Sequence, residues 1–346
     1  MQCCRNCGFV FNGAFDESMM DYGAKYDNTQ NCSIAFNDYV NGLVEHLIHD
    51  EQVQNKRIVE IGCGKGAFIR RLVEDENASN TGIGFDPTYT GPLSDLDGRL
   101  AFKRSFYDEL AATEQADVVV CRHVIEHVPD PLTLLNSMRH ALAGSPNARV
   151  YFETPCVDWI LSQEVIWDFF YEHCSLFTPA SLKTAFEVTG FNVRCVSHVF
   201  EGQYLWIEAE IASTEIEPNP TPGRTSELAE HFTALEQQRV DSWTRLVRDL
   251  KPSGNIAIWG AGAKGVTFVN LVDPDRTLLD CVVDVNPAKQ GKYLPGTGHP
   301  IIAPEDLRVR SVDVALVLNP NYYLEIQQSL DESDLNVRVI NVMKEC

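Results

Sequence analysis

The chain has 346 residues, more than one compact core usually holds, so we expect two domains. Its 28 basic and 49 acidic residues give a formal net charge of −21. A surface of this sign repels polyanions, so we expect neither nucleic acids nor anionic membranes as partners.

The cysteine count and the apolar runs indicate a compartment. Eleven cysteines, an odd number, are scattered over a long chain, which is typical of reduced thiols. No apolar run is long enough to span a bilayer, and Met1 is not followed by the apolar stretch of a signal peptide. We expect a cytoplasmic protein, as a monomer or a small homo-oligomer.

A short cysteine cluster begins the chain. Cys4 and Cys7 form a Cys-x-x-Cys-Gly pattern that is half of a zinc ribbon or knuckle. A structural zinc ion normally takes four ligands in a tetrahedron, and Cys3 and Cys32 are poorly spaced to complete the set. We therefore treat Cys4 and Cys7 as half a site and expect no bound zinc.

From residue 34 onward, helical and strand patterns alternate. Apolar residues at helical spacing predict helices over 34–48 and 132–142. Short runs rich in β-branched residues predict four strands: 57–62, 81–86, 116–121 and 148–153. Strand–helix alternation of this kind predicts a parallel sheet with crossover helices.

The segment WDFFYEHCSLFT, residues 167–178, places an acid and a histidine, Glu172 and His173, among five aromatic residues. Burying an unpaired charge is costly, so such a pair lies near the surface or is held in place by specific partners. The residues alone leave two interpretations open, a solvated loop and a catalytic pair in an apolar pocket.

The rest of the chain contains a linker and a second alternation. Thr178, Pro179 and Gly190 predict the N-cap, the first turn and the C-terminal cap of one helix. A strand candidate, 202–211, precedes a polar, proline-rich linker, 212–224. The remaining pattern predicts a long helix at 227–250 and four strands, at 255–260, 280–285, 313–318 and 337–342.

A glycine loop follows the first predicted strand of the main alternation. In EIGCGKG, the residues Glu60, Gly62, Gly64 and Gly66 stand where strand turns to helix, and glycines there let a ligand approach the backbone. Asp86 ends the next strand, where an acid can bind both hydroxyls of a ribose. The alternative is a glycine-lined turn that binds nothing.

The G-x-G-x-G spacing after Glu60 resembles the first motif of class I S-adenosylmethionine-dependent methyltransferases. NAD-binding loops usually space the last glycine one residue further. The resemblance implies that the loop contacts the methionine part of S-adenosylmethionine and that Asp86 binds its ribose. Ser105 and Phe106 would then lie near the adenine.

A further segment, RHVIEHVPDP at 122–131, is similar to one that family members carry at the mouth of the cofactor site. His127 could therefore face the substrate. Because the segment recurs in methyltransferases with very different acceptors, a merely structural His127 is the alternative.

A second glycine loop, WGAGAKG at 259–265, also fits the G-x-G-x-x-G pattern, and Asp284 ends the next strand. Alone, these residues would predict a dinucleotide site. The segments 282–301 and 318–326 instead resemble the C-terminal domain of the sugar C-methyltransferase family. With the CxxCG start, the methyltransferase core and the aromatic-Glu-His segment, this resemblance covers nearly the whole chain.

The resemblance implies an α/β protein, with a class I methyltransferase Rossmann-like core and a second, smaller Rossmann-like domain. The expected parts are a remnant Cys-containing segment (1–32), the methyltransferase domain (33–211), the linker (212–224) and the C-terminal domain (225–346). The implied reaction is methyl transfer from S-adenosylmethionine to a carbon of a nucleotide-linked 4-keto deoxysugar. Relatives complete the zinc site with an earlier Cys-x-x-Cys pair, and we expect a shortened or decayed site here.

The family pattern Tyr-x-Glu-His aligns with Phe170 to His173, so phenylalanine replaces the family tyrosine. C-methylation requires a carbanion, and a ketone beside the target carbon makes one accessible as an enolate. His173 is the candidate base because histidine titrates near neutrality. Glu172 is its partner or a ligand of a sugar hydroxyl, and Tyr171 or Tyr26 could replace the missing tyrosine.

Two other functions are compatible with the residues. The same scaffold could methylate oxygen or nitrogen of another small acceptor. A NAD-linked binding protein using the 260–265 loop is the second, and the intact residues Glu60, Gly64 and Asp86 argue against it.

Overall fold

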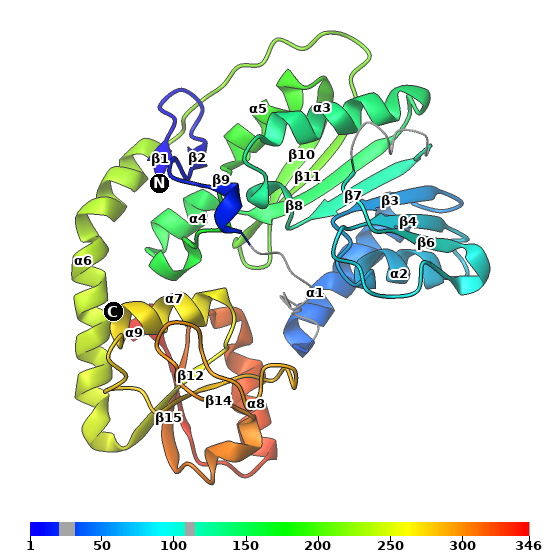
Figure 1. The fold of residues 1–346 in the computed structure, drawn as a ribbon. Coiled ribbons are helices and arrows are strands. Elements are labelled where there is room, and N and C mark those ends of the chain that lie inside the picture. The colour runs from blue at the N-terminus through cyan, green and yellow to red at the C-terminus, as the bar shows by residue number, and fades with distance from the viewer. Residues whose placement is uncertain (21–31, 108–114, 346) are drawn as a thin grey trace. The chain divides into compact units, whose positions relative to one another are not determined.

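The computed structural model describes residues 1–20, 32–107 and 115–345, and it contains two compact units, whose elements Figure 1 labels. The first unit takes the described residues of Met1–Asp27, Tyr39–Trp159 and Tyr171–Ala229. The second takes those of Asn28–Asp38, Ile160–Phe170 and Glu230–Cys346. Two short segments from the N-terminal half of the sequence therefore pack with the C-terminal part of the chain.

The first unit is built on an eight-stranded sheet. Its strands are β3 (Arg57–Ile61), β4 (Thr81–Phe85), β5 (Ser94–Asp95), β6 (Leu100–Lys103), β7 (Val118–Arg122), β8 (Arg149–Pro155), β10 (Phe191–Val199) and β11 (Tyr204–Ile211). They lie in the order β10-β11-β8-β7-β3-β4-β6-β5. Neighbours from β8 to β6 are parallel, and β11 is antiparallel to both β8 and β10. The predicted parallel sheet is confirmed.

Helices cover both faces of this sheet because side chains alternate along each strand. One set of strand residues, including Val59, Val119 and Val150, packs with α3 (Pro131–Ala141) and α5 (Pro179–Val188). On the other face, α2 (Ala67–Glu74) comes so close to β4 that a Cβ on Gly82 would lie 2.9 Å from Ile69. This α/β layering carries the carboxyl ends of β3, β4, β7 and β8 to one edge.

Helix α5 begins where the sequence predicts. The Thr178 hydroxyl accepts the N–H of Ser181 at 2.9 Å, and the Ser181 hydroxyl accepts the N–H of Thr178 at 2.9 Å, which makes a capping box. Pro179 occupies the first turn, and Gly190 follows the helix with φ of 84°. The cap fixes the end of the aromatic segment.

The remaining elements of this half of the chain are short. Strands β1 (Gln2–Cys3), β2 (Val10–Phe11) and β9 (Ser175–Leu176) form a small antiparallel sheet. Helix α1 (Ile34–Glu45) continues into a π-helical turn over His46–Asp50, and α4 (Val157–Ser162) follows β8. The small sheet attaches the cysteine segment to the strand that follows His173.

The second unit contains a five-stranded parallel sheet in the order β14-β13-β12-β15-β16. Its elements are α6 (Thr225–Leu250), β12 (Asn255–Trp259), α7 (Ala263–Val272), β13 (Cys281–Val283), β14 (Ile301–Ile302), β15 (Val312–Val317), α8 (Tyr323–Glu332), β16 (Arg338–Asn341) and α9 (Val342–Glu345). Ile326 and Leu330 of α8 pack on one face of the sheet. The predicted second, smaller α/β unit is confirmed.

The described residues contain neither a membrane-spanning helix nor a disulfide. In the part of the chain that the structure describes, none of the helices has the length and apolar character needed to cross a membrane. The ten cysteines within the described ranges form no disulfide.

Candidate active site

The first glycine loop joins β3 to α2 with three glycines in the left-handed region. Gly62, Gly64 and Gly66 have φ of 66°, 54° and 76°. A Cβ on Gly62 would lie 2.2 Å from Val124, and one on Gly66 would lie 2.4 Å from Phe102. A Cβ on Gly64 would meet no described heavy atom within 4 Å, so the backbone is open there to a ligand.

Two acids support this loop in different ways. The Asp86 carboxylate, half-buried at the end of β4, accepts the N–H of Gly64 at 2.9 Å and the N–H of Thr88 at 2.7 Å. The Glu60 carboxylate is buried and accepts the N–H of Ile69 at 3.1 Å, and its burial raises the pKa to about 8. Glu60 thus holds the loop from within, and Asp86 lies where a ribose would be bound.

The other predicted cofactor residues lie at the end of β6. Ser105 and Phe106 are both exposed, with Phe106 at 75%. Their contact with the adenine stays a prediction. Tyr26, the candidate replacement for the family tyrosine, lies outside the described residues.

A buried network of charges lies at the carboxyl ends of β7 and β8. The Glu153 carboxylate, wholly buried, accepts hydrogen bonds from Arg122 Nε at 2.5 Å and from the Tyr39 hydroxyl at 2.8 Å. His123 Nε2 lies 3.1 Å from Glu153, and its Nδ1 lies 3.3 Å from the Glu126 carboxylate. One imidazole therefore connects two buried carboxylates.

This network predicts how stability depends on pH. Burial opposes the charged form of His123, yet Glu153 and Glu126 outweigh it and raise the pKa to about 9. Because the pKa is higher in the folded state, protonated His123 stabilises the fold fully at a pH below 6.5, the ordinary histidine pKa. This stabilisation is lost as the pH rises through 9. The free energy of unfolding should therefore fall between pH 6.5 and 9, and His123 contributes at most about 1.4 kcal/mol per pH unit to this fall. The buried Glu60, whose pKa is raised to about 8, adds a loss of the same sign between pH 4.5 and 8.

Urea denaturation at a series of pH values measures this slope. A His123→Gln variant should lose the His123 part of this slope, most clearly between pH 8 and 9, where Glu60 has largely titrated. A variant at the exposed His140 should keep the whole slope. At the acid end, burial raises the pKa of Glu153, but Arg122 and His123 outweigh burial and lower it to about 2. That contribution is present above pH 4.5 and is lost as pH falls toward 2. If the free energy of unfolding falls as steeply between pH 8 and 9 in His123→Gln as in wild type, the raised pKa of His123 is contradicted.

Next to this network, His173 meets the adjacent residues Glu126 and His127, from which it is distant in the sequence. One oxygen of Glu126 and one ring nitrogen each of His127 and His173 lie within 4.8 Å of one another. The two imidazole rings are nearly perpendicular, with centroids 4.8 Å apart. Glu126 is wholly buried, His173 is buried and His127 is half-buried. We call Glu126, His127 and His173 the histidine cluster.

The geometry assigns a tautomer to neutral His127. Its Nδ1 lies 3.1 Å from the carbonyl oxygen of Glu172, which can only accept a hydrogen bond. Nδ1 therefore carries the proton, and Nε2 carries the lone pair that can take up another.

The segment that holds His173 is fixed on both sides of the cluster. The Tyr171 hydroxyl accepts the N–H of Asp16 at 2.7 Å, and the Cys174 thiol donates to the carbonyl of Glu126 at 3.6 Å. Glu172 is half-buried, whereas His173 is only 8% exposed. A solvated loop is thus the wrong description of His173, and the carboxylate placed beside both imidazoles is that of Glu126.

Sequence reasoning missed Glu126, Arg122, His123 and Glu153. Three of them lie in RHVIEH, a segment in which only His127 is predicted as a candidate from the sequence. A 3-10 turn over Ile125–His127 places the side chain of Glu126 in the interior. An acid at the end of an otherwise apolar strand, as in VYFETP, is a signal that could have indicated Glu153.

The histidine cluster has a donor set that could also hold a divalent cation, because carboxylate and imidazole are common ligands. At the N-terminus, hydrogen bonds from the backbone N–H groups of Asn6 and Cys7 lower the pKa of the Cys4 thiol. No third metal-binding side chain joins these two within the described ranges. Zinc at Cys4 and Cys7 stays untested.

A second cluster of His46, Glu51 and Glu208 lies on another part of the first unit. The guanidinium of Arg194 already binds Glu51 at 2.5 Å, and His46 Nε2 lies 2.8 Å from Glu208. These are satisfied ion pairs, so the cluster is structural.

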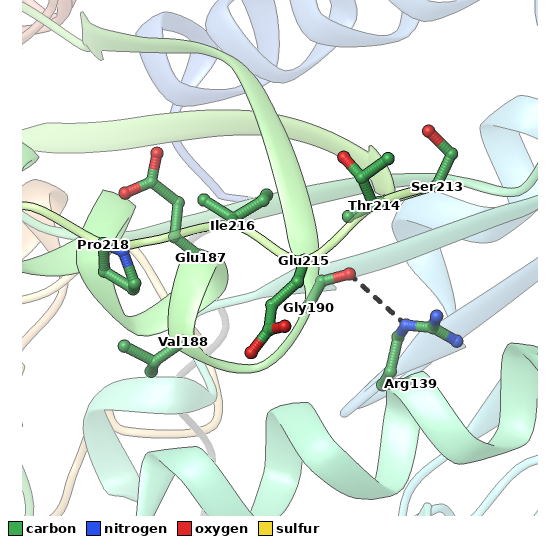
Figure 2. A pocket seen from close by; sticks show the side chains of 10 residues that line it. Arg139, Glu187, Val188, Gly190, Ser213, Thr214, Glu215, Ile216 and Pro218 are labelled. Carbon is green, nitrogen blue, oxygen red and sulfur yellow. Dashed lines mark hydrogen bonds between the residues drawn. The ribbon is translucent and has the colours of Figure 1, made fainter.

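A hollow of about 560 Å³ opens beside the C-terminal end of α5 (Figure 2). Arg139 Nε donates to the carbonyl of Gly190 at 3.3 Å at one side of it. The lining residues are Arg139, Glu187, Val188, Gly190, Ala212, Ser213, Thr214, Glu215, Ile216 and Pro218. None of them belongs to the glycine loop or to the histidine cluster, so the hollow is separate from the candidate active site.

Two models of known families match this chain. Residues 36–196 match the model of a methyltransferase domain, and residues 222–337 match that of a C-methyltransferase C-terminal domain. The chain is an S-adenosylmethionine-dependent methyltransferase. Its first unit has the class I methyltransferase fold, with the glycine loop and Asp86 at the carboxyl edge of the sheet.

Individual relatives of this methyltransferase were also found. It is 28% identical to C-methyltransferase NovU of Streptomyces niveus over 288 residues, 78% of this chain and 67% of the relative. It is 30% identical to the ubiquinone biosynthesis O-methyltransferase of Salmonella enteritidis PT4 (strain P125109) over 105 residues, 29% of this chain and 42% of the relative.

Among solved structures, a Burkholderia thailandensis 1,6-didemethyltoxoflavin-N1-methyltransferase with bound S-adenosylhomocysteine is 13% identical. The match covers 52% of this methyltransferase and 82% of that chain, with a TM-score of 0.39.

Proposed function

We propose that this methyltransferase transfers a methyl group to a carbon beside the ketone of a nucleotide-linked 4-keto deoxysugar. The observation that carries the proposal is the histidine cluster, a buried acid–base group in the unit that holds the glycine loop. The match of residues 222–337 to a C-methyltransferase C-terminal domain supports carbon as the acceptor atom.

S-adenosylmethionine supplies an electrophilic methyl group when bound. The loop residues fit it, because Gly64 leaves its backbone open and Asp86 presents a carboxylate at the end of β4. What the chain must add is a nucleophilic carbon. A C–H bond next to a ketone breaks when a base removes the proton, and its electron pair enters the enolate. That carbon then forms the new C–CH₃ bond, and the ketone is restored.

His173 is the proposed base. It is only 8% exposed and its ring packs on that of His127, and a site closed to water protects an enolate from protonation. Glu126, wholly buried beside it, stabilises the imidazolium that forms on proton uptake. His127, with its Nδ1 proton donated to the Glu172 carbonyl, is oriented to exchange a proton through Nε2.

Two predicted residues receive narrower roles. The Glu172 side chain is half-buried, which suits a ligand of a sugar hydroxyl better than a partner of the base. The Tyr171 hydroxyl is bound to the N–H of Asp16, so Tyr171 is a poor substitute for the tyrosine that Phe170 replaces.

Hydrogen exchange at the sugar carbon tests the proposal. The protein is incubated in D₂O with S-adenosylhomocysteine and each member of a panel of nucleotide-linked 4-keto deoxysugars. We expect one deuterium at the carbon beside the ketone for the true substrate, and C-methylation of the same sugar when S-adenosylmethionine is supplied. Methyl transfer to oxygen or nitrogen without this exchange would contradict carbon as the acceptor.

A further inference from the structure

The aromatic segment is divided between the two units. Residues Ile160–Phe170 pack with the second unit, and the chain enters the first unit at Tyr171. Trp167, 1% exposed, has its ring centroid 4.7 Å from that of Trp243 in α6 and 5.5 Å from that of Phe268 in α7. The part of the segment before Tyr171 is therefore anchored in the core of the second unit.

An ion pair lies next to this aromatic anchor. Lys264 Nζ lies 2.6 Å from one carboxylate oxygen of Asp168 and 2.7 Å from the other. The side chain of Asp168 is only 8% exposed and that of Lys264 is 29% exposed. A carboxylate buried to this degree needs its partner, because loss of the cation leaves an uncompensated charge.

Lys264 belongs to the second glycine loop, in which the backbone at Gly260 and Gly262 is as open as that at Gly64 of the first loop. The Asp284 carboxylate, which would bind a ribose in a dinucleotide site, accepts the N–H of Ala261 at 2.8 Å. A Cβ on Gly265 would lie 1.9 Å from the carbonyl oxygen of Gly260, so Gly265 allows close packing inside the loop. The lysine of this loop binds a carboxylate of the chain itself, that of Asp168.

Only residues 169–172 separate Asp168 from His173. Three residues after Asp168, the chain is held within the first unit, because the Tyr171 hydroxyl accepts the N–H of Asp16 at 2.7 Å. Asp168 is therefore the last charged anchor of the second unit before the histidine cluster.

We propose that Lys264 is a positioning residue for the base, which acts by holding Asp168 and through it the chain that presents His173. The inference rests on the proposed role of His173. Without the cation, the Asp168 carboxylate must reach water, and the 3-10 turn over Ile166–Asp168 must shift to let it. Catalytic geometry tolerates little displacement, since a misplacement of about 1 Å can cost about 10²-fold in rate.

Kinetics on the full-length chain test this role. For Lys264→Met we expect kcat to fall roughly 10–100-fold, with the KM for the sugar and the affinity for S-adenosylhomocysteine within about twofold of wild type. Lys264→Arg should restore most of kcat because it restores the cation. The matched control is Lys251→Met, which removes another ion pair of the second unit, to Asp280 at 2.8 Å.

Three results would overturn the proposal. The first is an unchanged kcat in Lys264→Met, and the second is a loss of kcat in Lys251→Met as large as that in Lys264→Met. The third is a rise in KM together with a fall in thermal stability in Lys264→Met, both of which persist in Lys264→Arg. The last would show a purely structural ion pair.

Amide hydrogen exchange separates this inference from the proposed reaction. If wild type methylates no sugar of the panel, the reaction is wrong, and exchange in peptide 171–174 still reports the positioning. We expect faster exchange there in Lys264→Met than in Lys251→Met, with no change at the glycine loop. Equal exchange in the two variants would overturn the inference.

Discussion

Replacing His173 by alanine is expected to lower turnover by roughly 10²–10⁴-fold, the usual contribution of a positioned acid–base group. The change removes the proposed base and leaves its neighbour His127 in place. S-adenosylhomocysteine should bind as in wild type, because the glycine loop joins β3 to α2 and Asp86 follows β4, and neither segment contains His173. Steady-state turnover and isothermal titration measure the two effects separately.

The matched control is His140→Ala, which removes an exposed histidine from α3 and should leave turnover unchanged. Turnover at the wild-type level in His173→Ala would remove His173 from the mechanism. The next residue to test would then be His127, because its Nε2 already holds the lone pair. Loss of cofactor binding in His173→Ala would indicate damage to the fold instead.

Replacing Arg122 by methionine is expected to lower the free energy of unfolding by roughly 3–5 kcal/mol. The change leaves the wholly buried Glu153 without its guanidinium partner, and it removes a cation that lies 4.5 Å from the centre of the Phe68 ring. Chemical denaturation followed by circular dichroism measures the loss.

The control for Arg122 is Arg57→Met, at the opposite end of a neighbouring strand. Arg57 pairs with Asp117 at 3.1 Å, but its side chain is half exposed, so this loss should cost about 0–1 kcal/mol. The double variant Arg122→Met with Glu153→Gln should recover part of the stability, because no uncompensated charge is left. Equal effects of the two arginine changes would contradict a buried network.

The sequence could predict what depends on local pattern. Strands β3, β4, β7 and β8, helix α3 and the capped start of α5 follow from periodicity and from residues such as Thr178, because each is determined by side chains close together in the chain. The antiparallel place of β11 between β8 and β10 depends on long-range pairing, which no local pattern encodes. The same holds for the packing of residues 160–170 with the second unit.

The candidate site was predictable to a similar degree. Gly62, Gly64 and Gly66 could be found because a turn with positive φ leaves a visible mark in the sequence. Glu126 could not be recognised as the carboxylate of the histidine cluster, because its approach to His173 depends on the 3-10 turn after β7. The adjacent acid, Glu172, was the natural but less buried candidate.

The crowding at Gly265 has a consequence for reading glycine fingerprints. If the third glycine of a G-x-G-x-x-G pattern is required by the carbonyl of Gly260 at 1.9 Å, it is retained whether or not a nucleotide ever binds. The spacing alone therefore reports a packing requirement of the loop and does not establish a dinucleotide site. The residue directly before the last glycine is Lys264, whose bond to the protein's own Asp168 carboxylate gives the loop a role in the fold that needs no nucleotide.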